Sequence, residues 1–237
     1  MNDSLIFLPG WCLGRGPLQS TVDALGGTIF DLPGYGKAPL IESFDAAAAD
    51  IAARLPERCI LAGWSLGAQL ALAIAARAPD KVSKLLLVAG TASFVQRDGW
   101  PHAMPVQTLA EFAEAIAADA EAMLPRFVGG FNRGDQDAKA CTARLLELAD
   151  PRPTAPVLAT GLNWLRDVDL RPELARIHAP TLLIHGAADP LMPLGAAEAL
   201  QAAVPQARLQ ATPACAHAPF ISRPDEFLSA CRTFLHE

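Results

Sequence analysis

Short apolar runs recur along the chain, and they predict the strands of a central sheet. Each run has four to six residues, consists mostly of Leu, Ile, Val or Phe, and stops at Gly, Pro or Asp. Runs without a polar face are typical of parallel strands that are buried on both sides. The predicted strands are Leu5–Leu8, Thr28–Asp31, Cys59–Gly63, Lys84–Ala89 and Thr181–His185, with Ala207–Gln210 as a candidate sixth.

Stretches with helical composition separate these runs, and abundant alanine favours helices there. Because strand and helix alternate, we predict an α/β fold with a mostly parallel central sheet and helices on both faces. The length of 237 residues is enough for one such domain with a substantial core. The predicted helices are Gly16–Leu25, Phe44–Leu55, Leu66–Ala78, Leu194–Ala203 and Pro224–Leu235.

The alternation breaks between residues 91 and 172. This span carries three helical patterns and no convincing strand: Thr108–Leu124, Gln136–Ala149 and Pro153–Leu165. It begins directly after a strand end, which is where α/β sheets bind their ligands. We therefore expect a core of residues 1–90 and 173–237 and an all-helical lid of residues 91–172. The alternative is a set of ordinary crossover helices.

Composition and charge exclude several classes of protein. Half of the residues are hydrophobic, yet no uninterrupted apolar run approaches the length that spans a bilayer, so we expect no membrane segment. The net charge of −6 argues against a nucleic-acid-binding protein, which usually carries a basic surplus. The amino terminus has no basic start and no cleavage-type segment, so we predict no signal peptide.

The five cysteines are odd in number, scattered, and without CxxC spacing; they are Cys12, Cys59, Cys141, Cys215 and Cys231. This pattern predicts reduced thiols in a cytoplasmic protein rather than a disulfide framework or a metal site. Each thiol is expected to serve packing rather than chemistry. We also expect a monomer that needs no metal and no cofactor.

The most informative segment is Gly63-Trp64-Ser65-Leu66-Gly67, which follows one apolar run and precedes a helical stretch. The Gly-x-Ser-x-Gly pattern between a strand and a helix is typical of a nucleophilic serine on a strained turn. The flanking glycines are needed because a Cβ there would clash with the neighbouring strand and helix. We therefore predict that Ser65 is a nucleophile; the alternative is an ordinary strand-to-helix turn.

A serine hydroxyl needs a base, and the base needs an orienting carboxylate. In this fold the expected chain order is Ser, then Asp or Glu, then His. Of the five histidines, His217 alone combines that order with a loop position after the last strand-like run. Asp189 lies just beyond a strand end in a loop of small residues and is the predicted carboxylate. Asp167 and Asp169, near the end of the helical span, are the competitors.

The negative charge that develops on the substrate oxygen requires two backbone N–H donors. The amide of Leu66, directly after the nucleophile, is one predicted donor. The other is the amide of Trp11, in the loop after the first strand, whose indole is also expected to line the acyl pocket. The segment Asp31–Gly36 has a Pro-Gly turn and no Lys-Ser/Thr after its glycines, so we interpret it as structural rather than as a phosphate loop.

These motifs together resemble the α/β-hydrolase superfamily over essentially the whole chain. Within it, three segments resemble the pimeloyl-[acyl-carrier protein] methyl ester carboxylesterases of biotin synthesis. They are the tryptophan before the nucleophile, Arg97-Asp98-Gly99-Trp100-Pro101 at the start of the expected lid, and Ala216-His217-Ala218-Pro219-Phe220-Ile221-Ser222. The superfamily motifs alone would not separate this esterase from its many relatives.

The resemblance implies a reaction and its parts. The enzyme would hydrolyse the methyl ester of a pimeloyl chain carried by acyl carrier protein, with Ser65 attacking, His217 relaying the proton and Asp189 orienting the imidazole. Trp64 and Phe127 would line a narrow apolar channel for the acyl chain. The acidic carrier protein would dock on basic residues of the lid, with Arg126 at the matching position and Arg133, Lys139 and Arg144 as nearby candidates.

Two features depart from the family pattern. Relatives usually have a histidine where this chain has Pro9, which affects the oxyanion loop. The chain also starts almost at its first strand, without the usual hairpin, so we expect a shorter sheet and an intact triad.

Rival interpretations share much of this site. A general short-chain carboxylesterase, a thioesterase or a C–C bond hydrolase would use the same triad, so only the acyl pocket and lid discriminate between them. A non-catalytic member of the fold would use the pocket as a receptor.

Overall fold

A parallel six-stranded sheet forms the centre of the molecule in the computed structural model, which describes residues 3–237. The strand order is β2-β1-β3-β4-β5-β6, and every neighbouring pair is parallel. The α/β prediction is therefore confirmed. The strands are β1 (Ser4–Leu8), β2 (Thr28–Ile29), β3 (Cys59–Trp64), β4 (Val82–Val88), β5 (Thr181–Gly186) and β6 (Ala207–Thr212).

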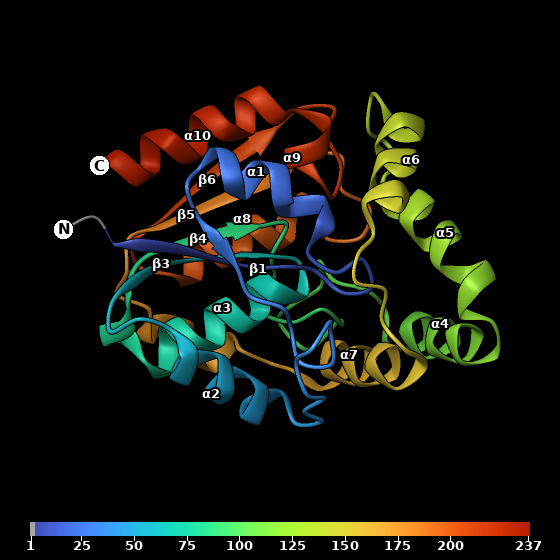
Figure 1. Ribbon diagram of the computed structural model, residues 1–237. Coiled ribbons are helices and arrows are strands. Elements are labelled where there is room, and N and C mark those ends of the chain that lie inside the picture. The colour runs from blue at the N-terminus through green and yellow to red at the C-terminus, as the bar shows by residue number, and fades with distance from the viewer. Residues whose placement is uncertain (1–2) are drawn as a thin grey trace.

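Helices cover both faces of this sheet. Helices α1 and α10 contact each other on one side, and α2 and α3 lie together on the other (Figure 1). The helices of the core are α1 (Gln19–Ala24), α2 (Phe44–Arg54), α3 (Leu66–Arg77), α8 (Leu194–Ala203), α9 (Pro219–Ser222) and α10 (Pro224–His236), and the short 3-10 turns are η1 (Gly16–Leu18), η2 (Pro79–Lys81) and η3 (Arg171–Arg176).

The centre of the core is β3 and the helix that follows it. Every residue of β3 is buried, and α3 is buried from Leu66 to Ala76. Small residues permit this close packing. A Cβ on Gly63 would lie 2.3 Å from the carbonyl oxygen of Gly67, and a Cβ on Gly67 would lie 2.3 Å from that of Leu8. Both glycines of the predicted motif are therefore required by backbone contacts.

Between β4 and β5 the chain forms four α-helices, the 3-10 turn η3 and no strand, as the interrupted alternation predicts. They stand together at one end of the sheet (Figure 1). The helices are α4 (Val106–Ala118), α5 (Ala120–Phe131), α6 (Ala138–Leu148) and α7 (Ala155–Asp167).

Two predicted elements were wrong in extent. The single helix predicted over Thr108–Leu124 is two helices, because Asp119 leaves helical geometry and its Oδ1 accepts the amide of Ala122 to begin α5. The strand predicted over Thr28–Asp31 ends at Ile29. Asp31 instead pairs with Arg15 at 2.7 Å.

The two ends of the helical insertion are fastened to each other by Arg97. Its guanidinium Nη2 donates to the carbonyl oxygens of Arg166 and Asp167, at the end of α7, at 3.0 and 3.1 Å. Its Nε donates to Ser93 Oγ at 2.9 Å. The Arg-Asp-x-Trp-Pro segment therefore joins the entry and the exit of the insertion.

In the described part of the chain, no helix has the length and apolar character needed to cross a membrane.

Candidate active site

Ser65 occupies a strained turn between β3 and α3. Its φ of +56° and ψ of −116° place it outside the regions that L-residues favour. The turn is held because Ser65 N donates to the carbonyl of Val88 on the adjacent strand at 2.9 Å. Strain of this kind persists only where surrounding packing imposes it. The geometry is that of a serine whose hydroxyl is presented at the carboxyl end of the sheet.

Asp189 lies in the loop after β5 and is almost completely buried. Its Oδ1 accepts the backbone amides of Leu191 and Met192, at 2.8 and 3.0 Å. Its Oδ2 lies 2.7 Å from Nδ1 of His217. Because a carboxylate oxygen accepts, Nδ1 carries the proton in this contact, and Nε2 is the ring nitrogen left without a contact to Asp189.

His217 lies on the loop between β6 and α9 and is 1% exposed. The indole of Trp64 donates to its backbone carbonyl at 2.9 Å, and the rings of Trp64 and Phe131 pack against the imidazole. The structure therefore brings His217 and Asp189 together. The competing carboxylates Asp167 and Asp169 pair instead with arginines at the end of the insertion.

Ser65 and His217 line one small cavity of about 10 Å³. Among the described residues no hydrogen bond joins Ser65 Oγ to the imidazole in this conformation. Catalytic hydrogen bonds are often long or misaligned without substrate and tighten in the reacting complex. The chemistry requires Ser65 Oγ and the His217 imidazole to come within hydrogen-bond distance, and both side chains line this cavity.

A second histidine, which the sequence analysis did not select, packs against the same carboxylate. His185 Nε2 lies 2.6 Å from the carbonyl oxygen of Met192, so this nitrogen carries the proton, and it is 3.8 Å from Asp189 Oδ2. Burial lowers the pKa of His185, which keeps the ring neutral at neutral pH. In the sequence, only its position four residues before Asp189 indicates that His185 could lie beside that carboxylate.

The loop after β1 supplies the other side of the cavity. Gly10 and Trp11 line it together with Ser65. Among the described residues, neither the Trp11 amide nor the Leu66 amide donates to another protein group, and Leu66 is the first residue of α3, where amides point outward. Both amides are therefore free of protein partners, and their role as oxyanion donors stays a prediction.

The Trp11 indole does more than line the cavity, because its Nε1 donates to the carbonyl of Leu158 in α7 at 3.1 Å. The next residue, Cys12, has a φ of +70°, and its amide donates to the hydroxyl of Tyr35 at 2.9 Å. The segment Asp31–Gly36, which was interpreted from the sequence as structural, thus contacts this loop through the hydroxyl of Tyr35. These two hydrogen bonds, from the Trp11 indole and from the Cys12 amide, fix the loop that contains Pro9.

Apolar side chains complete the cavity wall. Trp64 and Phe127, which were predicted together with Trp11 to line the acyl pocket, both contribute, and Phe131 lies beside them. A groove of about 300 Å³ between α4, α5 and the loop after β5 shares Phe127, Phe131 and Leu191 with the cavity. The phenylalanines of α5 therefore separate the outer groove from the space at Ser65.

The four basic residues predicted to dock a carrier protein are exposed on the insertion. Arg126 lies on α5 and lines the outer groove. Arg133 follows α5, and Lys139 and Arg144 lie on α6, where Arg144 pairs with Glu147 at 2.7 Å. Of these four residues, only Arg126 lines the outer groove, which shares part of its wall with the cavity at Ser65.

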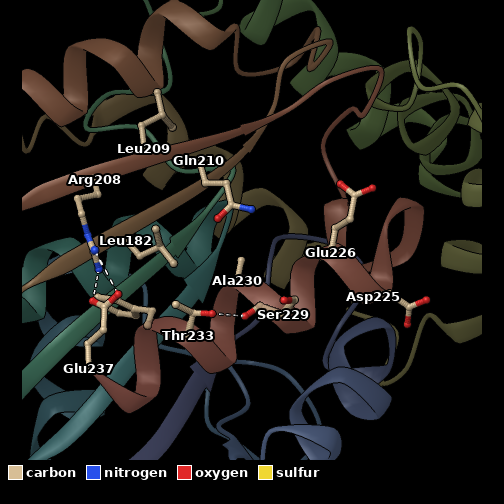
Figure 2. A pocket seen from close by; sticks show the side chains of 11 residues that line it. Leu182, Arg208, Leu209, Gln210, Asp225, Glu226, Ser229, Ala230, Thr233 and Glu237 are labelled. Atoms are coloured by element: carbon tan, nitrogen blue, oxygen red, sulfur yellow. Dashed lines mark hydrogen bonds and ion pairs between the residues drawn. The ribbon is translucent and has the colours of Figure 1, made fainter.

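A larger hollow of about 710 Å³ lies away from Ser65, between β6 and α10 (Figure 2). Its wall carries the ion pair of Arg208 with Glu237 and the hydroxyl of Thr233, which donates to Ser229 O at 3.0 Å. Asp225 and Glu226 line it as well. This hollow holds no serine–histidine pair, so its size alone does not make it the reaction site.

All five cysteines carry free, buried thiols. Burial raises the pKa of Cys59 to about 11 and those of Cys215 and Cys231 to about 12, so these thiols stay protonated near neutral pH. The described residues include no group of three or more His, Cys, Asp or Glu side chains that could hold a metal ion.

Comparison with known proteins shows the family of this chain. The profile of the Alpha/beta hydrolase family matches residues 5–230. A pimeloyl-[acyl-carrier protein] methyl ester esterase of Nitrosomonas europaea is 40% identical over 95% of this chain and 92% of its own length. The protein of the same name from Pectobacterium carotovorum is 38% identical over 95% and 91%.

A solved esterase from Exiguobacterium antarcticum has a TM-score of 0.88 at 24% identity and covers 99% of this chain and 92% of its own, which shows the shared fold. The chain is a carboxylic ester hydrolase that belongs to the alpha/beta hydrolase family, in the group of pimeloyl-[acyl-carrier protein] methyl ester esterases.

Proposed function

We propose that this enzyme hydrolyses the methyl ester of pimeloyl-[acyl-carrier protein], releasing methanol and the free pimeloyl carboxylate on its carrier, in biotin synthesis. The observation that carries the proposal is similarity along nearly the whole chain to esterases of that name. A buried His217–Asp189 pair beside Ser65 supports the chemistry, because ester hydrolysis needs an activated nucleophile.

In the proposed mechanism, Ser65 Oγ attacks the ester carbonyl and Nε2 of His217 takes the hydroxyl proton. The imidazolium is stabilised by Asp189 through its 2.7 Å contact with Nδ1. His217 then gives the proton to the departing methoxide, which leaves as methanol. A water molecule, deprotonated by the same imidazole, hydrolyses the acyl-enzyme and restores Ser65.

The amides of Trp11 and Leu66 are the proposed donors to the oxyanion. Neither donates to a protein group in the described residues, so neither must break a bond to receive the developing charge. Donors held in place before the reaction are effective because they need no reorganisation at the transition state.

We assign the acyl chain to the apolar wall formed by Trp11, Trp64 and Phe127. A cavity of about 10 Å³ has room for about one water molecule and none for an acyl chain. The phenylalanines of α5 must therefore move before substrate binds. This requirement supports a lid function for residues 91–172 over the core of residues 1–90 and 173–237.

The carrier protein is proposed to approach over the outer groove, with Arg126 at its edge and Arg133, Lys139 and Arg144 as further contacts. Basic side chains would attract an acidic partner and orient it. We further propose a monomeric, cytoplasmic enzyme. Five free thiols are compatible with a reducing compartment.

The proposal is tested by complementation of a biotin auxotroph that lacks this esterase. The wild-type chain is expected to restore growth without biotin, and Ser65→Ala is expected not to restore it at equal protein level. Failure of the folded wild-type chain to support growth would refute the assigned substrate, and growth on Ser65→Ala would refute the assigned nucleophile.

A further inference from the structure

A buried carboxylate from the helical insertion reaches the loop that carries His217. Asp135 lies in the turn between α5 and α6, and only 7% of its surface is exposed. An acidic side chain is seldom this buried unless its oxygens are satisfied by donors. The mechanism above gives this carboxylate no role.

Asp135 forms a hydrogen bond with the loop that carries His217. Its Oδ2 accepts the backbone amide of Ala216, the residue before His217, at 2.9 Å. Its Oδ1 accepts the hydroxyl of Ser222 at 2.9 Å and the amide of Asp137 at 2.8 Å. These contacts join positions up to 87 residues apart in the chain.

The carboxylate is charged in this setting. Burial disfavours the ionised form, but the hydrogen bonds from Ser222, Asp137 and Ala216 and the nearby guanidinium of Arg223 outweigh burial and lower the pKa of Asp135. A charged acceptor makes these hydrogen bonds stronger than bonds between neutral groups.

A second backbone contact supports the same junction, because Gln136 N donates to the carbonyl of Ala214 at 3.0 Å. On the opposite side of the loop, Trp64 Nε1 donates to the carbonyl of His217. The backbone is thus held on both sides of the imidazole: at Ala216 N by the insertion and at His217 O by the strand that ends in the nucleophile.

We propose that Asp135 is a positioning residue that holds the His217 loop in the register needed for proton transfer from Ser65. The helical insertion then supplies part of the catalytic apparatus in addition to covering it. This role rests on the proposed function of His217 as the base. Asp135 acts through the backbone of Ala216 and touches no substrate.

The test compares Asp135→Ala and Asp135→Asn with Asp119→Ala. Asp119, an exposed carboxylate of the same insertion, is the control, because its Oδ1 accepts the backbone amide of Ala122 at the start of α5. For each folded variant, kcat and KM are measured on p-nitrophenyl butyrate, together with the rate of Ser65 labelling by a fluorophosphonate. Labelling depends on the base but needs no carrier protein.

We expect Asp135→Ala to lose about 10- to 100-fold in both kcat and labelling rate, with a nearly unchanged KM, because a small displacement of a catalytic group has that effect. Asp135→Asn should still lose about two- to fivefold in both rates, because its amide oxygen accepts Ala216 N without the charge that strengthens this hydrogen bond. Asp119→Ala should keep both rates within about twofold even where its melting temperature falls.

Wild-type kcat and labelling in Asp135→Ala, with only a lowered melting temperature, would show that the carboxylate merely stabilises the fold and would overturn the proposal. If Asp135→Ala does not fold, the decision rests on Asp135→Asn, where wild-type labelling would overturn it. A wild-type chain that does not label would refute the Ser65–His217 mechanism itself, which is a separate result.

Discussion

Two residues near the triad show how one side chain can serve both packing and chemistry. Trp64 was predicted as a wall of the acyl channel, and it does line the cavity. Its indole N–H also holds the backbone carbonyl of His217. The tryptophan before the nucleophile thus links the strand of Ser65 to the loop of the base, a contact between residues 153 positions apart.

His185 is the other such residue. It holds the Asp189 loop closed through Met192 O, and its burial favours the neutral ring. The pKa of His185 is lower in the folded chain than in the unfolded chain, where it is near 6.5. The stability that neutral His185 contributes is therefore present above pH 6.5 and is lost as the pH falls through its lower folded pKa.

We accordingly expect the free energy of unfolding to fall below pH 6.5, with this residue contributing a slope of up to about 1.4 kcal/mol per pH unit. Urea unfolding between pH 8 and pH 5 measures it. In His185→Gln, which cannot titrate, the decline should be shallower. The same pH dependence in both proteins would exclude His185 as its source.

At the scale of elements, periodic patterns predicted the existence of the helices better than their ends. The break at Asp119 has a local cause, a side-chain cap, inside a sequence that is helical in composition on both sides. The joint between the two ends of the insertion has no local cause, because Arg97 binds carbonyls 69 and 70 residues away. Such a joint becomes visible only in three dimensions.

The Arg97 joint predicts a stability effect. Arg97→Ala should lower the free energy of unfolding by about 2 kcal/mol, because it removes charge-assisted hydrogen bonds to Arg166 O, Asp167 O and Ser93 Oγ. Urea denaturation measures the change. Arg144→Ala, which removes the exposed pair with Glu147, is the control and should cost about 0.5 kcal/mol or less. Equal losses in the two variants would contradict a structural joint at Arg97.

At the scale of the whole molecule, the sheet, its order of strands and helices, and the helical interruption were all predictable from the sequence. The strained turn at Ser65 was predictable because its motif is local, and the contact between His217 and Asp189 was predictable from chain order and loop position. The catalytic roles of the three residues stay predictions. The contacts of Asp135 and of the Tyr35 hydroxyl could not be predicted. They depend on how distant loops meet at the end of the sheet, and no local pattern records that.

The proposed docking of the carrier protein depends on the charge that the surface of the enzyme presents to it. Arg126→Glu should reduce kcat/KM on the carrier-linked ester by about tenfold or more while leaving p-nitrophenyl butyrate nearly unaffected, because charge reversal impairs encounter with an acidic partner. Steady-state kinetics on both substrates measure the difference. Arg58→Glu makes the same change in net charge on an exposed side chain at the start of β3 and should have little effect. Equal losses on both substrates would remove the docking role of Arg126.

The most direct test of the account is the hydrolysis of purified pimeloyl-[acyl-carrier protein] methyl ester by the wild-type chain and by Ser65→Ala. The wild type is expected to release methanol and the free carboxylate, and a normally folded Ser65→Ala is expected to lose on the order of 10⁴-fold or more in rate. Turnover by Ser65→Ala close to that of the wild type would contradict the mechanism. A wild-type enzyme that cleaves p-nitrophenyl butyrate but leaves the carrier-linked ester intact would contradict the substrate.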